Sequence, residues 1–168
     1  MATTTLYLVR HAKAADRFEW TGPDRGRPLT GKGRQQAAWL AGALAGEPLA
    51  LVAASPWLRC RLTAEPSAAA AGLEPTIDPR LGYDEPDVGG WVAAAVKAAE
   101  ADPDRAPGSL VAVGHGDLLP DFLAREGLLR GFPGFRIGSL FKVPISDGQL
   151  GPVTYVDRAE LRQLGERR

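Results

Sequence analysis

Both histidines of this 168-residue chain directly follow an apolar run, and one of them has an arginine beside it. The segment "LYLVRHAKA" (6–14) places Arg10 next to His11, and "SLVAVGH" (109–115) ends in His115. A neutral imidazole is nucleophilic near neutral pH. An arginine guanidinium is a permanently charged fork that binds phosphate oxygens through two parallel hydrogen bonds. Residues of these two types at one site would suit the transfer of a phosphoryl group.

The elements that must position these residues follow from the apolar pattern. Apolar runs without strict alternation, typical of parallel strands covered on both faces, lie at 5–10, 49–56 and 109–115. Helical patterns lie at 27–46, with Thr30 as N-cap, at 57–72, interrupted by Pro66, and at 91–102, 117–129 and 158–168. Two late strands are expected at 138–145 and 151–157, with Gly148 in the turn between them.

The alternation of strands and helices predicts the fold class. We expect one α/β domain over 1–168, a three-layer α/β/α sandwich with a mostly parallel central sheet. The stretch 73–90 is rich in proline, glycine and acids and reads mainly as a long loop, with a short strand at 75–77.

The carboxyl ends of parallel strands meet at one edge of a sheet, which is where such folds bind ligands. The first strand delivers Arg10 and His11 there, the second leads to Arg59 through "SPWLR", and the third delivers His115. Two arginines and a second histidine around a nucleophilic histidine would hold the phosphoryl oxygens and neutralise their charge without a metal. The sequence therefore predicts a phosphoryl pocket and no cofactor.

Composition limits the alternatives. Twenty Lys and Arg balance twenty Asp and Glu, so no overall basic field would attract a nucleic-acid polymer or an anionic membrane. No stretch approaches the ~20 apolar residues of a membrane helix, and no basic leader precedes one, so we expect a cytoplasmic protein. The lone Cys60 excludes an internal disulfide and is expected to face the core. One cysteine and two histidines are poor material for a zinc site.

Three segments carry a resemblance to a known family: "LVRHAKA", "RPLTGKGRQQA" and "SPWLRCRLTAEP". Together they resemble the histidine phosphatase superfamily, also called phosphoglycerate mutase-like, and within it the small branch of SixA-type phosphohistidine phosphatases. Ala12 stands where the family usually has glycine. The segments "LRCRLTAEP", "GHGDLLPDFL" and "GSLFKV…DGQL" are also similar to the phosphatase domain that follows a Nudix domain in some actinobacterial nucleotide hydrolases.

The resemblance implies a role for each matching residue. His11 would be the nucleophile that becomes phosphorylated, Arg10 and Arg59 would bind the phosphoryl oxygens, and His115 would stabilise the transferring group. Independently of the resemblance, the loop "DRFEWTGPDRGRPLT" offers Arg17, Arg25 and Arg27 as candidates for the mouth of the pocket, either binding substrate or remaining solvated loop charges. Arg27, just ahead of "PLT", is the preferred substrate-binding residue among them.

Many relatives carry a glutamate, the general acid, soon after a leucine in the middle loop. Here that place reads "RLGYDEPD", with Tyr83 nearest to the matching position. The sequence leaves Asp84 and Glu85 as candidate acids, Asp84 being preferred, and expects Asp117 to cap the helix after His115.

The resemblance implies a metal-independent phosphatase that hydrolyses phosphomonoesters or phosphohistidine through a phosphohistidine on His11. The alternative from another class is a non-catalytic module that binds a phosphoprotein or phosphate. A nucleotide or polyphosphate hydrolase and a phosphoglycerate-type mutase are further alternatives, although the larger mutases carry insertions for which this chain has no room. The expected partner is a phosphorylated small molecule or a phosphohistidine protein, such as a histidine-phosphotransfer protein. The sequence decides neither the substrate nor the oligomeric state.

Overall fold

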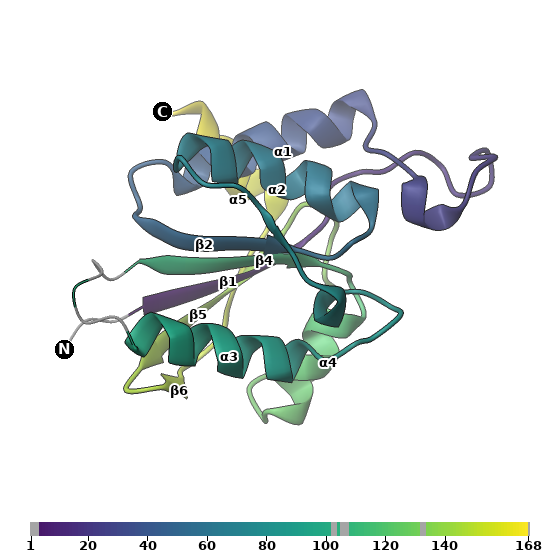
Figure 1. Ribbon diagram of the computed structural model, residues 1–168. Helices are drawn as coiled ribbons and strands as arrows, with labels where there is room; N and C mark the ends of the chain where they lie inside the picture. Colours follow the sequence, from purple (N-terminus) through teal and green to yellow (C-terminus); the bar gives the residue numbers. More distant parts are fainter. Residues whose placement is uncertain (1–3, 102–103, 105–107, 132–133, 168) are drawn as a thin grey trace.

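The computed structural model describes residues 4–101, 104, 108–131 and 134–167, and within them a central sheet lies between two helical layers (Figure 1). The strands are β1 (Thr4–Arg10), β2 (Leu49–Ala54), β3 (Thr76–Ile77), β4 (Ser109–Gly114), β5 (Leu140–Ser146), β6 (Gln149–Leu150) and β7 (Thr154–Val156). The helices are α1 (Gly31–Leu44), α2 (Leu58–Ala70), α3 (Val88–Glu100), α4 (Leu118–Arg125) and α5 (Arg158–Glu166), with 3₁₀ turns η1 (Asp24–Gly26) and η2 (Pro79–Leu81). The expected α/β sandwich is confirmed.

The sheet has the strand order β3-β2-β4-β1-β5-β6, and β7 also pairs with β5. The pairs β3–β2, β2–β4 and β4–β1 are parallel, whereas β5 runs antiparallel to β1, β6 and β7. The register places Arg10 opposite Gly114, one residue before each histidine. Two strands far apart in sequence therefore end side by side and deliver His11 and His115 to the same edge.

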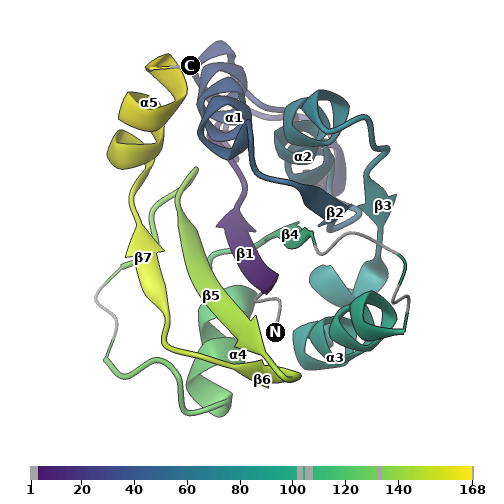
Figure 2. The same cartoon turned by 90° about the vertical axis from the view of Figure 1, so that its left-hand side faces the viewer.

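The side chains of β1 alternate between two separate cores, which explains why the whole strand is apolar. Leu6 and Leu8 pack into the core under α3 and α4, while Tyr7 and Val9 pack into the core under α1, α2 and α5. Figure 2 shows α1, α2 and α5 on one side of the sheet and α3 and α4 on the other. A strand with both faces covered holds the residues at its end in a fixed position.

Two helices show how local sequence sets the boundaries. Helix α1 begins after Thr30, whose side chain accepts a hydrogen bond from the backbone N–H of Gly33 as predicted. Helix α2, expected to be interrupted at Pro66, instead runs through it to Ala70. Proline removes one backbone hydrogen bond, but the buried face on either side of it keeps the helix packed against the sheet and α1.

The segment 73–90 holds more regular structure than its composition indicates. It contains β3 and η2, and α3 starts at Val88 because Asp87 caps the helix by accepting the N–H of Gly90. The strand β6 was not expected and pairs with β5 beyond a turn in which Asp147 and Gly148 both have positive φ. The ends of two expected helices, residues 102 and 168, lie outside the described residues.

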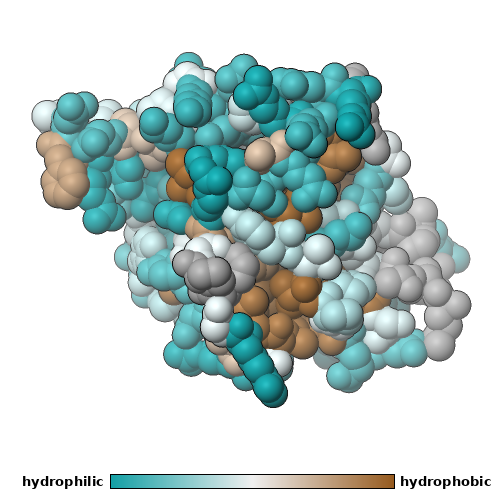
Figure 3. All heavy atoms as spheres, turned by 180° about the vertical axis from the view of Figure 1, so that it is seen from behind, coloured by the Kyte–Doolittle hydropathy of each residue, from teal (hydrophilic) through white to brown (hydrophobic). Residues whose placement is uncertain are grey.

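The β1–α1 connection projects beyond the carboxyl ends of the parallel strands, at the right of Figure 1 and the left of Figure 3. A turn at Asp16 shapes this segment, since its carboxylate accepts the N–H of Phe18 and its carbonyl accepts that of Trp20. The Phe18 side chain is 90% exposed. Among the described residues, no helix has the length and apolar character needed to cross a membrane.

Candidate active site

The structure brings four of the predicted site residues together at the carboxyl edge of the sheet. Arg10 ends β1, His11 follows it, Arg59 lies in the first turn of α2, and His115 follows β4. The rings of His11 and His115 lie 5.8 Å apart between centroids. Arg59 Nε donates to His11 Nε2 across 3.3 Å. Residues separated by more than a hundred positions thus form one cluster.

The environment of His11 fixes which ring nitrogen can react. Its Nδ1 lies 2.8 Å from the carbonyl oxygen of Ala12, an acceptor, so Nδ1 carries the proton and Nε2 keeps its lone pair. Burial lowers the pKa of His11 to about 3, and the charges of Arg59 and Arg10 add to this effect. The imidazole is therefore neutral at neutral pH, with a nucleophilic nitrogen at Nε2.

Arg59 is held by Asp24, which is not among the residues predicted for the site. The guanidinium of Arg59 donates from Nη1 to the Asp24 carbonyl at 3.1 Å and from Nη2 to its Oδ2 at 3.2 Å. Arg27 donates from Nε to the other carboxylate oxygen at 3.0 Å. Partial burial acts to raise the pKa of Asp24, but its bonds to Arg27 and Arg59 outweigh this and lower it. One ionised carboxylate thus orients two arginines.

The side chain of Arg10 lies across Gly116, and this contact explains the glycine after His115. A Cβ on Gly116 would lie 2.5 Å from Arg10 Nε, so a larger residue would force the guanidinium away. Arg10 Nη1 donates to the Phe135 carbonyl, whereas Nε is buried with no partner among the described residues. Burial lowers the pKa of Arg10, yet arginine stays charged in proteins. A buried donor without a partner is suited to a bound anion.

His115 has a similar orphan atom. Its Nε2 lies 2.9 Å from Ser55 Oγ, and its Nδ1 is buried with no partner among the described residues. Ser55 Oγ already accepts the N–H of Trp57 at 3.3 Å, which leaves its own proton for His115 Nε2. This network favours the tautomer that carries a proton on Nδ1, and Nδ1 can then donate to a ligand. Burial lowers the pKa of His115 to about 4.

Cys60 faces the core, as predicted. Its side chain is buried, with Sγ 3.7 Å from the Gly114 carbonyl and 3.7 Å from His115 Nε2. Burial raises the pKa of the thiol to about 12, although the charge of Arg59 opposes this. A protonated thiol is not a nucleophile. Cys60 therefore packs beneath His115.

The 73–90 loop places its residues differently from the sequence expectation. Asp84 is exposed and forms an ion pair of 2.7 Å with Arg25, and Glu85 is exposed; neither lines the cavity beside the histidines. Tyr83 does line it, with its ring 4.2 Å from that of His115. Its hydroxyl donates to Asp117 Oδ1 at 2.8 Å. Asp117 also caps α4 as expected, by accepting the Leu118 N–H at 2.9 Å.

An open cavity of about 620 Å³ lies over this cluster. Five cationic side chains line it together with His11, Tyr83 and Asp117, namely those of Arg10, Lys13, Arg17, Arg27 and Arg59. Such a concentration of positive charge, in a chain whose net charge is zero, makes the cavity attractive to anions. Arg27 is mostly buried and is anchored by the Ala15 carbonyl at 2.6 Å as well as by Asp24.

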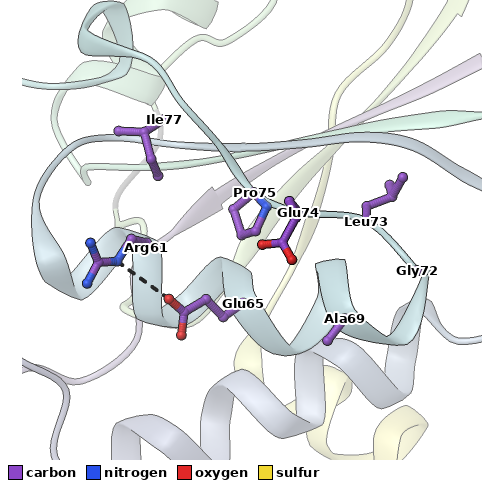
Figure 4. A pocket seen from close by; sticks show the side chains of 8 residues that line it. All are labelled: Arg61, Glu65, Ala69, Gly72, Leu73, Glu74, Pro75 and Ile77. Carbon is purple, nitrogen blue, oxygen red and sulfur yellow. Dashed lines mark ion pairs between the residues drawn. The ribbon is translucent and has the colours of Figure 1, made fainter.

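A second hollow, of about 630 Å³, lies between α2 and the segment that leads into β3 (Figure 4). It contains the ion pair between Arg61 and Glu65 at 3.5 Å, and also Glu74. None of the predicted site residues lines it. This hollow has neither the histidines nor the excess of cations that phosphoryl chemistry requires.

The cavity thus joins a neutral nucleophilic imidazole to several cationic side chains. Arg10 Nε, on the cavity, and Nδ1 of the neighbouring neutral His115 are buried donors without a partner among the described residues. Such a cavity is suited to binding a phosphoryl group next to a nucleophilic histidine. Asp24 and Ser55 were missed as contributors to the site. Their only signal in the sequence is position, since Asp24 lies shortly before Arg27 and Ser55 begins the "SPWLR" segment that leads to Arg59.

A comparison with protein families identifies the class. Residues 6–125 match the model of the histidine phosphatase superfamily (branch 1), so the chain belongs to that superfamily. The match includes Arg10, His11, Arg59 and His115.

The chain is also similar to individual proteins. The chain is 30% identical over 158 residues to an 8-oxo-(d)GTP phosphatase of Mycolicibacterium smegmatis, covering 92% of this chain and 48% of that relative. It therefore spans about half the length of the curated relative it matches. Among solved structures, the protein histidine phosphatase SixA complexed with tungstate superposes with a TM-score of 0.70 at 24% identity, covering 92% of this chain and 95% of that one. A mycobacterial glucosyl-3-phosphoglycerate phosphatase gives 0.66 at 17% identity, covering 92% and 97%. These structures share the fold.

Proposed function

We propose that this protein is a metal-independent phosphatase that hydrolyses phosphomonoesters or phosphohistidine through a phosphohistidine on His11. The observation that carries the proposal is the pair of contacts on the His11 ring. Nδ1 is tied to the Ala12 carbonyl, and Nε2, with its lone pair, lies beside the guanidinium of Arg59. A nucleophile and a phosphoryl-binding group thus share one position.

In the proposed reaction, Nε2 of His11 attacks phosphorus and the leaving group departs from the opposite side. Arg59 moves its N–H groups from Nε2 to the phosphoryl oxygens, while Arg10 Nε and His115 Nδ1 gain the partners they lack. Arg27 binds the substrate near the cavity mouth. These cations and donors neutralise the charge that a metal supplies in other phosphoryl-transfer enzymes. Water then hydrolyses the phosphohistidine.

Hydrolysis of p-nitrophenyl phosphate in excess chelator tests the proposal. The wild type should turn over, and His11→Ala should reduce kcat by at least about a thousandfold because no nucleophile remains. Rapid quenching should trap an acid-labile, base-stable phosphoryl group on the wild type only. Full activity in His11→Ala, or loss of wild-type activity in chelator, would contradict the mechanism.

A second candidate is a module that binds phosphate or a phosphoprotein without turnover. The observation that favours it is the placement of Asp84 and Glu85 outside the cavity, which leaves both predicted acids away from the substrate. Calorimetry with inorganic phosphate separates the two functions. Binding without hydrolysis of p-nitrophenyl phosphate would support the module.

The proposed partner is a phosphorylated small molecule or a phosphohistidine protein. Comparing a nucleotide, a sugar phosphate and a phosphohistidine peptide as ligands and substrates would identify which of these partners the protein prefers.

A further inference from the structure

Tyr83 and Asp117 form a hydrogen-bonded pair on the wall of the cavity. Neither residue takes part in the reaction proposed for His11. They come from different elements, the loop before α3 and the N-terminus of α4, and both line the cavity with His11. Tyr83 packs on the ring of His115 at 4.2 Å and meets that of Trp57 edge-on at 5.4 Å. The pair is therefore fixed beside the phosphoryl site.

The two oxygens of the Asp117 carboxyl group are used unequally. Oδ1 accepts both the Tyr83 hydroxyl, at 2.8 Å, and the Leu118 N–H, at 2.9 Å. Oδ2 has no hydrogen-bond partner among the described residues. Oδ1 is therefore occupied by two donors, and Oδ2 is the oxygen that remains available to a substrate.

We propose that Asp117 is the general acid of the reaction and that Tyr83 positions it. This inference rests on the proposed function and names the residue that serves the leaving group. Asp117 lines the same cavity as His11, Arg10 and Arg59, so its carboxyl group borders the space that a bound phosphoryl group and its leaving group would occupy. The residues that the sequence suggested, Asp84 and Glu85, do not line the cavity.

In the proposed reaction Asp117 gives up one proton in the first step and regains one in the second. As Nε2 of His11 bonds to phosphorus, the bond from phosphorus to the leaving oxygen breaks, and that oxygen takes the proton from Asp117. The alcohol leaves. The Asp117 carboxylate then takes a proton from the water whose oxygen attacks phosphorus. The phosphorus–nitrogen bond breaks, its electron pair returns to Nε2, and Asp117 is again protonated.

Tyr83 acts through Asp117. Its hydroxyl donates to Oδ1 and so orients Oδ2, while burial and this hydrogen bond raise the pKa of Tyr83, so that it remains a donor. Tyr83→Phe keeps the ring contact with His115 and removes only the hydrogen bond. This substitution therefore isolates the positioning role.

Leaving-group dependence tests the proposal. An alkyl leaving group such as that of β-glycerol phosphate needs a proton, whereas p-nitrophenolate needs little help. Asp117→Asn should lower kcat/KM for β-glycerol phosphate about a hundredfold or more and that for p-nitrophenyl phosphate less than about tenfold. Asparagine caps helices as well as aspartate, so α4 should keep its start, and retained p-nitrophenyl phosphate hydrolysis would report an intact fold. Tyr83→Phe should show a smaller loss with the same selectivity.

Asp121→Asn is the matched control, because Asp121 is an exposed residue of the same helix, paired with Arg125 at 2.9 Å. It should leave both rates unchanged. Equal losses on both substrates in Asp117→Asn, or a selective loss in Asp84→Asn or Glu85→Gln instead, would overturn the assignment and leave the histidine mechanism standing. Wild type active on p-nitrophenyl phosphate but not on β-glycerol phosphate would also overturn it. No turnover of either substrate by the wild type would overturn both proposals.

Discussion

Arg59 Nε lies 3.3 Å from His11 Nε2, so the guanidinium expected to bind the phosphoryl oxygens is hydrogen-bonded to the nitrogen expected to attack phosphorus. The same guanidinium contacts Asp24 through its two terminal nitrogens. All three nitrogens of the fork are therefore engaged, and a substrate must exchange with some of these contacts. These hydrogen bonds keep the Arg59 guanidinium in place, and a bound anion can replace some of them.

Arg59→Lys should lower kcat/KM for p-nitrophenyl phosphate by about a hundredfold or more, because a lysine ammonium cannot reproduce a planar fork with three engaged nitrogens. Arg61→Lys is the matched control, two positions along on the exposed side of α2 and paired with Glu65. It should change the rate little. Steady-state kinetics on both variants, with circular dichroism to compare their folding, checks this prediction. Similar rates for the two variants would contradict it.

The two histidines should make the protein less stable in acid. Burial lowers the pKa of His11 to about 3 and that of His115 to about 4, below the ordinary value near 6.5 of an unfolded histidine. In this window the unfolded chain binds more protons than the folded one, so stability is present above about pH 6.5 and is lost as the pH falls. The loss should reach roughly 2 kcal/mol per histidine by about pH 5.

Urea unfolding between about pH 7 and 5 measures this loss. His11→Gln cannot titrate and should show a pH dependence smaller by about one proton. A free energy of unfolding that does not change over this range, in a protein that stays two-state, would show that the histidines are not buried as neutral groups.

Gly116→Ala should weaken phosphate binding about tenfold or more without unfolding the protein. The new Cβ would lie 2.5 Å from Arg10 Nε and 2.8 Å from its Cδ, so the guanidinium must leave its present position. Gly31→Ala, at the start of α1 with open space around the added carbon, is the control and should bind phosphate normally. Calorimetric titration with inorganic phosphate compares the three proteins. An unchanged affinity in Gly116→Ala would remove Arg10 from the binding set.

Ser55→Ala should shift the tautomer of His115. Without the Ser55 hydroxyl, only the Cys60 thiol, a weak donor at 3.7 Å, remains beside Nε2, and the proton is free to move there from Nδ1. Nitrogen chemical shifts of the labelled imidazole should then change from a Nδ1–H pattern toward a Nε2–H pattern. Phosphate affinity should fall by about tenfold, the worth of one hydrogen bond. Ser67→Ala, another buried serine but on α2 away from the histidines, should change neither readout.

How far the sequence predicts this molecule depends on the range of the interactions involved. The run 5–10, the Thr30 cap and the apolar run 109–115 are local patterns, and each became the expected strand or helix end. The predictions at Pro66 and in the 73–90 loop were incomplete because contacts between distant residues decide the structure there. Packing of α2 keeps a helix that proline alone would break, and pairing with β2 orders β3 within the loop.

The sequence by itself determined the class of fold and the chemical types at the site. His11, Arg10, Arg59 and His115 stand at strand ends or the helix start that follows, and parallel strand ends must share an edge. Only the tertiary structure decided which side chains contact these four residues. It paired Arg59 with Asp24 and His115 with Ser55, and set Asp84 outside the cavity while Tyr83 and Asp117 line it. A loop's side-chain directions depend on contacts with residues distant in sequence, and no local pattern contains that information.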